Sequence, residues 1–200
     1  MIVKICGITN PEDALAAAEA GASAIGLIFY PASRRYVPPE TAAAIVEALP
    51  RSLWKVGVFV NEPPERVAAV AEHARVDAVQ LYGDTASPPG WRVWRALSVG
   101  PDFGLEHLDD WPSAEAFVLE PAVAGSYGGT GQTFPWALAR GAPRKVILAG
   151  GLHAGNVREA IRAARPWGVD ASSSLETAPG RKDHARVAAF IAAALSEAES

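Results

Sequence analysis

The stretch "IVKICGITNPEDALAAAEAGASAIGLIF", residues 2–29, contains the pattern that decides the fold. Two short apolar runs, 2–6 and 23–29, flank an alanine-rich segment between them. That segment opens with Asn10, a favourable helix N-cap, and closes with Gly21, a residue that suits the position just after a helix. Short continuous apolar runs are typical of parallel strands that are buried on both faces. The stretch therefore predicts a strand–helix–strand unit.

The same alternation continues along the chain. Further strand-like runs lie at 54–60, 76–83, 91–99, 116–120, 145–151 and 168–174. Helix-like segments lie at 38–49, 63–74, 154–166 and 183–198, while 84–90 reads as weakly helical, 102–114 as a short helix or loop, and 121–141 as a long glycine-rich connection. Eight strand candidates that alternate with helices predict an α/β fold, a closed (β/α)8 barrel in a single domain over residues 1–200. A doubly wound open sheet is the alternative, but it normally needs fewer strands, and its G-x-G-x-x-G fingerprint is missing after the first strand.

Composition limits the class of partner and the compartment. Half of the 200 residues are hydrophobic and the formal net charge is −4, which is ordinary for a globular protein and gives no basic stripe for nucleic acid. A compact anionic substrate would have to be held by local hydrogen-bond donors. One cysteine cannot form an internal disulfide, and no apolar run approaches 18 residues. We therefore expect a cytoplasmic protein without a membrane segment.

Two residues at strand ends are candidates for proton transfer. Cys6 ends the first strand and Glu120 ends the sixth, and in a parallel barrel both ends open toward the same mouth. A buried structural thiol and a solvated carboxylate are the simpler interpretations of each residue alone. Together, a thiolate that accepts a proton and a desolvated carboxylic acid that donates one form the minimum set for an isomerase.

The ends of the last two strands predict a phosphate site. "LAGGL" contains Gly150 and Gly151, which allow the backbone to approach a ligand closely, and "DASSSLE" contains three consecutive serines ahead of a short helix. The serines Ser172, Ser173 and Ser174 offer N–H and hydroxyl donors, although an ordinary helix cap is the alternative. In a barrel, the loops after strands seven and eight are the usual phosphate site.

Other motifs give weaker signals. "SRRY", 33–36, follows the second strand and places an arginine fork where it can clamp a carboxylate. The loop "YGGTGQTF", 127–134, has the glycine content of a mobile lid, or of a plain connector. The four histidines have no metal-ligand spacing, so no metal site is expected.

These motifs closely resemble one family. "KICGIT", "GLIFYPASRRYV", "GVFVN", "QLYGD", "YGGTGQTF", "LAGGL" and "GVDASSSLETAPGRKD" occur in the order typical of phosphoribosylanthranilate isomerases, from residue 3 to residue 183. The resemblance implies a cofactor-free barrel of tryptophan biosynthesis. It also implies an Amadori rearrangement of N-(5-phosphoribosyl)anthranilate to 1-(2-carboxyphenylamino)-1-deoxyribulose 5-phosphate.

The resemblance also implies roles for individual residues. Cys6 matches the cysteine that serves as general base, and Arg35 matches the arginine that meets the anthranilate carboxylate. The glycine-rich loop, with Gly129, looks like the family's lid and contributes to substrate binding. Glu120 stands where the family usually has an aspartate acid, and Tyr82 stands where it usually has a histidine. Ser174 replaces a glycine near the expected phosphate.

Two other functions compete with this one. Another phosphosugar isomerase or epimerase would generally use paired carboxylates or a metal, and its first strand would not read "KICGIT". A non-catalytic phosphate-binding barrel is favoured only by the change from aspartate to Glu120. For the leading function we expect a small phosphosugar–anthranilate substrate, no cofactor, no nucleic acid, no membrane, and a monomer or a homodimer.

Overall fold

The barrel strands follow one another in sequence order and close on themselves. A computed structural model describes residues 1–123 and 131–198. All eight strand pairings are parallel, and the last strand pairs with the first. The strands are β1 (Ile2–Cys6), β2 (Ala24–Ile28), β3 (Trp54–Val60), β4 (Ala78–Tyr82), β5 (Val93–Val99), β6 (Ala116–Pro121), β7 (Lys145–Leu148) and β8 (Gly168–Ala171). The predicted closed parallel barrel is confirmed, and the open sheet is excluded.

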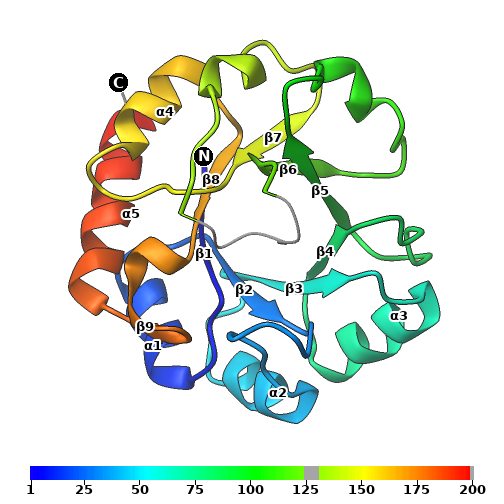
Figure 1. Cartoon of the computed structure of the whole chain (residues 1–200). Helices are drawn as coiled ribbons and strands as arrows, with labels where there is room; N and C mark the ends of the chain where they lie inside the picture. The colour runs from blue at the N-terminus through cyan, green and yellow to red at the C-terminus, as the bar shows by residue number, and fades with distance from the viewer. Residues whose placement is uncertain (124–130, 199–200) are drawn as a thin grey trace.

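The helices cover the barrel unevenly (Figure 1). Within the described ranges, the α-helices are α1 (Pro11–Glu19), α2 (Pro39–Glu47), α3 (Pro64–His73), α4 (Val157–Ala164) and α5 (His184–Ala198). They lie outside the arc that runs from β7 and β8 through β1 to β4, whereas loops and two short 3-10 helices, η1 (Leu105–Leu108) and η2 (Trp136–Ala139), cover the side of β5 and β6. The helical expectation for 84–90 is wrong: this segment is a turn and loop, because Pro88 and Pro89 cannot continue a helical hydrogen-bond pattern.

A buried arginine fastens the loop that replaces this helix. Arg95 on β5 is 1% exposed, and its guanidinium donates to the backbone oxygens of Gly83, at 2.7 Å, and Thr85. The same guanidinium lies 3.4 Å from the ring centroid of Trp111. Burial lowers the pKa of Arg95 to about 10, which still leaves the side chain charged at neutral pH. The cation therefore satisfies loop carbonyls that a regular helix would have paired internally.

The first βα unit forms as its sequence predicts. The side chain of Asn10 accepts a hydrogen bond of 2.8 Å from the backbone N–H of Asp13, which caps α1. Gly21 follows the helix with a φ of +97°, a conformation that glycine adopts without strain.

The predicted strands seven and eight were too long at their C-terminal ends. β7 ends before the positive φ angles of Gly150 and Gly151, and β8 ends before the 3-10 helix η3 (Ser173–Leu175).

Two apolar cores form because successive strand residues point to opposite faces. The larger core lies between the barrel and its helices and contains residues such as Ile5, Ile25 and Phe117. The smaller core fills the barrel around Trp94, which stacks on Trp54 with ring centroids 5.8 Å apart. Because these side chains fill the barrel at the N-terminal ends of the strands, the open space lies at the C-terminal ends.

A hairpin follows η3 and precedes α5. It consists of β9 (Glu176–Ala178) and β10 (Arg181–Lys182), paired antiparallel, and the sequence did not predict it.

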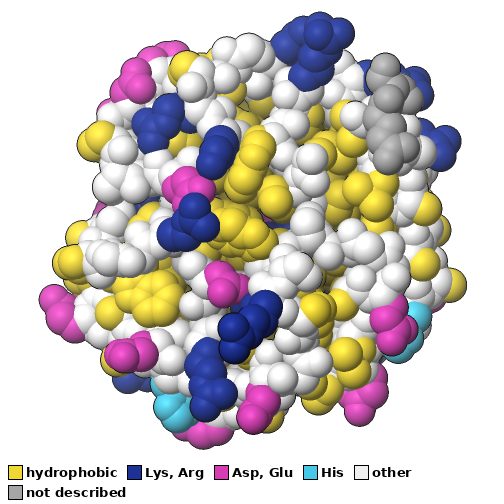
Figure 2. All heavy atoms as spheres, turned by 180° about the vertical axis from the view of Figure 1, so that it is seen from behind, with side chains coloured by type: hydrophobic (Ala, Val, Ile, Leu, Met, Phe, Trp, Pro, Cys, Tyr) yellow, Lys and Arg dark blue, Asp and Glu magenta, His cyan; other side chains and the backbone are white. Residues whose placement is uncertain are grey.

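Figure 2 shows the face behind that of Figure 1, where positive and negative side chains are interspersed around hydrophobic side chains near the middle. None of the helices in the described ranges combines the length and the apolar character that crossing a membrane requires.

Candidate active site

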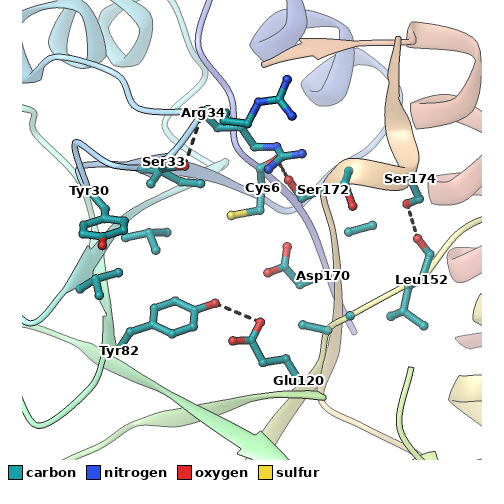
Figure 3. Close-up of a pocket in the computed structure, with 18 of the residues that line it drawn as sticks. Cys6, Tyr30, Ser33, Arg34, Tyr82, Glu120, Leu152, Asp170, Ser172 and Ser174 are labelled. Atoms are coloured by element: carbon teal, nitrogen blue, oxygen red, sulfur yellow. Dashed lines mark hydrogen bonds between the residues drawn. The ribbon is translucent and has the colours of Figure 1, made fainter. Parts of the chain in front are cut away.

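The C-terminal ends of the strands surround a cavity of about 380 Å³ (Figure 3). Nearly all the predicted site residues line it, although they come from five separate parts of the chain. These are Cys6, Arg35, Glu120, Gly150, Gly151, Ser172, Ser173 and Ser174. Gly129 lies outside the described residues.

Cys6 is the last residue of β1 and is 8% exposed, with its thiol at the wall of the cavity. Its strand partner is Gly26, where an added Cβ would lie 2.6 Å from the sulfur and 3.2 Å from Cε of Lys4. The glycine therefore makes the space that both side chains occupy. Burial raises the pKa of the Cys6 thiol, while the nearby charges of Lys4 and Lys182 oppose this shift.

A buried ion pair lies next to the thiol. Lys4 and Asp170 are register partners on β1 and β8, and Nζ of Lys4 is 2.7 Å from Oδ2 of Asp170. Burial by itself would lower the pKa of Lys4, but the Asp170 carboxylate raises it above its ordinary value, so the lysine is a cation. Among the described residues, Oδ1 of Asp170 has no hydrogen-bond partner, and the side chain reaches the cavity between Cys6 and Glu120.

Glu120 is suited to donate a proton near neutral pH. It is 5% exposed, and burial raises the pKa of its carboxyl group to about 7. Tyr82, the last residue of β4, donates a hydrogen bond of 3.3 Å to Oε2 of Glu120, which lowers the pKa and opposes the effect of burial. A carboxyl group with this pKa is protonated in a large fraction of molecules at pH 7.

Arg35 reaches the cavity from the segment after β2. Its Nε and Nη2 donate to both oxygens of Glu176, at 2.8 and 2.7 Å. Nζ of Lys182 lies 2.9 Å from the same carboxylate, and the Lys182 side chain is fully buried. Gly7, with a φ of +75°, leaves room for the arginine stem, because an added Cβ would lie 2.6 Å from Cδ of Arg35. The hairpin that carries Glu176 and Lys182 thus holds the guanidinium in place.

The glycines after β7 are required by close backbone contacts. An added Cβ on Gly150 would lie 2.2 Å from Cδ of Pro121, and one on Gly151 would lie 2.7 Å from the backbone oxygen of Gly131. Both glycines also have positive φ, at 83° and 60°. The segment from Gly131 to Thr133 therefore rests directly on the turn after β7, at the edge of the cavity.

The serine hydroxyls are directed differently from the prediction. Oγ of Ser172 donates to the backbone oxygen of Cys6 at 3.0 Å, and Oγ of Ser174 donates to the backbone oxygen of Leu152. These bonds tie η3 to the ends of β1 and β7. Among the described residues, the loop hydrogen bonds include none from the backbone N–H of Gly151, Ser173 or Ser174. The donors available at this edge are thus backbone amides.

Sequence reasoning did not identify several polar residues of this site. Lys4 and Asp170 each interrupt a short apolar strand, and Lys4 is two residues from Cys6, so strand alternation puts both side chains of β1 on one face. That signal could have identified the pair. Nothing local could have shown that Glu176 meets Arg35, because 141 residues separate them.

Comparison with known proteins identifies the family. Residues 3–193 match the family described as N-(5'phosphoribosyl)anthranilate (PRA) isomerase. The chain belongs to this isomerase family. An N-(5'-phosphoribosyl)anthranilate isomerase of Solibacter usitatus is 48% identical to it over 197 residues, which cover 97% of each chain.

Solved structures of the family share the fold. A phosphoribosyl anthranilate isomerase from Thermotoga maritima superposes with a TM-score of 0.90 at 41% identity, covering 98% of this chain and 100% of the other. A second isomerase structure, in complex with reduced 1-(o-carboxyphenylamino)-1-deoxyribulose 5-phosphate, superposes with a TM-score of 0.87 at 39% identity, with the same coverage. The family resemblance and the barrel inferred from the sequence are both confirmed.

Proposed function

We propose that this chain catalyses the Amadori rearrangement of N-(5-phosphoribosyl)anthranilate to 1-(2-carboxyphenylamino)-1-deoxyribulose 5-phosphate, a step of tryptophan biosynthesis in the cytoplasm. Cys6 is the general base and Glu120 the general acid. The observation that carries the proposal is that these two groups, 114 residues apart in sequence, line one cavity while burial raises the pKa of Glu120 to about 7.

The proton transfers follow from these positions. Glu120 donates its proton to the furanose ring oxygen, the bond from that oxygen to C1 breaks, and the anilino nitrogen forms a Schiff base with C1. The Cys6 thiolate then removes the proton from C2, and the electron pair forms the C1–C2 double bond of an enolamine. The enolamine tautomerises to the C2 ketone as C1 gains a proton and the C2 hydroxyl loses one, so substrate and product are isomers.

Both charged ends of the substrate have partners among the residues that line the cavity. The phosphate binds at the turn of Gly150 and Gly151 and at the amides of Ser173 and Ser174, where backbone N–H groups favour an anion. The hydroxyls of Ser172 and Ser174 donate to the backbone oxygens of Cys6 and Leu152 and so hold the serine segment in place. Arg35 binds the anthranilate carboxylate with the donors of its guanidinium that Glu176 leaves available. Gly129 belongs to the proposed lid.

Turnover of phosphoribosylanthranilate, followed by the loss of its fluorescence, tests the proposal. We expect Cys6→Ser and Glu120→Gln each to lower kcat by about 10²- to 10⁴-fold, the usual value of a general acid or base. Glu120→Asp keeps the carboxyl group and should retain activity. An unaffected Glu120→Gln variant would move the acid to another residue. A wild-type protein that binds the reduced product analogue without turnover would instead be a binding barrel.

The assembly state is tested separately. The sequence allows a monomer or a homodimer. Sedimentation equilibrium at the concentration of the activity assay distinguishes the two states, and equal specific activity across a dilution series would show that one chain is sufficient for catalysis.

A further inference from the structure

The proposed acid is one end of a buried hydrogen-bond chain. Nε2 of Gln80 donates to the phenol oxygen of Tyr82 at 3.2 Å, and the phenol donates to Oε2 of Glu120 at 3.3 Å. Gln80 and Tyr82 are two residues apart on β4, so strand alternation points both into the barrel. Figure 3 shows the phenol of Tyr82 directed at the Glu120 carboxyl group across the cavity.

We propose that Tyr82 is a positioning residue that fixes which oxygen of Glu120 carries the transferable proton. The inference rests on the proposed function, in which Glu120 is the general acid. It assigns no chemistry to the phenol itself, which stays protonated throughout the reaction.

The direction of each hydrogen bond supports this role. A phenol has a single hydrogen, which Tyr82 donates to Glu120, while its oxygen accepts the hydrogen bond from Gln80. Oε2 of Glu120 is then the accepting, carbonyl-type oxygen of the neutral acid. Because Oε2 accepts the phenol hydrogen, the acidic proton of the neutral acid is on Oε1. Gln80 is 1% exposed, so solvent does not compete for its amide.

The same hydrogen bond affects the ionisation of the acid. Asp170 on β8 and Lys4 on β1 are the charged groups that act on Glu120, with Cys6 also at the cavity wall. Burial and Asp170 raise the pKa of Glu120, whereas the phenol of Tyr82 and the charge of Lys4 lower it. The phenol stabilises the carboxylate, so its removal should raise the pKa of Glu120 above about 7.

The test is the pH dependence of kcat/KM for Tyr82→Phe, which removes only the hydroxyl. The reaction uses protonated Glu120 together with ionised Cys6, so the pKa of Glu120 sets one limb of the profile. That limb should move to higher pH by about one unit, the size of a weak hydrogen bond to a charged group, whichever side of the optimum it is on. A profile that superimposes on the wild-type profile, or that moves to lower pH, overturns the proposal.

Matched variants separate this role from general damage. Tyr36→Phe removes a phenol hydroxyl from a residue that is 37% exposed and outside the cavity, and its profile should match the wild type. Gln80→Met keeps the phenol but removes its donor, so the same limb should move in the same direction by a smaller amount. If Tyr82→Phe does not fold, as judged by circular dichroism, Gln80→Met alone decides the question by the direction of its shift.

A double variant distinguishes failure of this inference from failure of the proposed function. Glu120→Gln should abolish the limb, and adding Tyr82→Phe to it should change nothing further. If Glu120→Gln keeps the wild-type profile, then the proposed acid is wrong. If Glu120→Gln abolishes the limb but Tyr82→Phe leaves it in place at the wild-type pH, then Glu120 is the acid and only the role of Tyr82 is wrong.

Discussion

Lys4 and Asp170 form an ion pair of 2.7 Å inside the barrel, two residues deeper along β1 than Cys6. Lys4 and Cys6 project from the same face of β1 and share the space above Gly26. The pair therefore places a cation beside a sulfur atom whose pKa burial raises, and the charge of Lys4 opposes that shift in part. The positive charge of Lys4 favours the thiolate form of Cys6, which the proposed general base requires.

We expect Cys6 to react slowly with iodoacetamide in the free protein at neutral pH. Burial raises the pKa of this thiol, so the midpoint of the alkylation profile should lie above the ordinary value of about 8.5. Lys4→Met should move the midpoint further upward, because the cation is lost and Asp170 remains. Lys4→Met leaves Asp170 buried without its partner and could fail to fold for that reason. The double variant Lys4→Met/Asp170→Asn removes both charges and avoids this problem. Lys145→Met, at an exposed lysine, is the control. Faster alkylation of Lys4→Met would contradict the assignment.

Gly26→Ala should impair catalysis more than stability. The added Cβ would lie 2.6 Å from the sulfur of Cys6, so the thiol must move. A shift of about 1 Å in a reacting group costs roughly 10²-fold in rate, whereas overpacking costs about 1–3 kcal/mol in the free energy of unfolding. Gly100→Ala is the matched control, since its Cβ would make an ordinary contact of 3.6 Å with Ala122. Equal loss of activity in both variants would show that the position of the sulfur is unimportant.

Glu176→Gln should destabilise the fold in a pH-dependent way. Burial alone would raise the pKa of Glu176, but hydrogen bonds from Arg35 and Lys182 lower it below its ordinary value. Stability from this group is therefore present above the unfolded pKa of about 4.3 and is lost as the pH falls through the lower folded value. At pH 7 we expect a loss of about 3 kcal/mol in urea unfolding, because two cations are left without their carboxylate.

The same comparison at low pH is the check on this explanation. Near pH 3.5 the wild type begins to lose the contribution of the ionised carboxylate, so the difference between the wild type and Glu176→Gln should shrink. A constant difference at the two pH values would mean that the variant acts through packing and not through charge.

Arg95→Met should lower the free energy of unfolding by about 2–4 kcal/mol. The change leaves the backbone oxygens of Gly83 and Thr85 without their donor and removes the cation from the Trp111 ring. Arg95→Lys should not restore stability, since an ammonium group cannot reproduce the planar fork. Urea midpoints measure both effects, with the exposed Arg51→Met as a control within about 0.5 kcal/mol of wild type. If Arg95→Lys had the urea midpoint of the wild type, a positive charge without the guanidinium geometry would be sufficient to stabilise the loop.

Local pattern was enough for the strands but not for every connection. Apolar runs located all eight barrel strands, and the Asn10 cap and Gly21 stop located α1 to within two residues. The hairpin that contains Glu176 and Lys182 was missed, because its strands of three and two residues show no periodicity. The end of β8 was placed too late, since the serines that form η3 are equally compatible with a strand.

The sequence by itself determined that Cys6 and Glu120 would meet at one mouth, since parallel strands that close a barrel must all end on the same side. Only the tertiary structure decided which charges face them. Lys4 meets Asp170 across 166 residues, and Arg35 meets Glu176 across 141. These pairings depend on the register of β1 against β8 and on the fold of one short hairpin. A strand pattern is local, whereas register is fixed only when the whole cylinder closes and every side chain must fit at once.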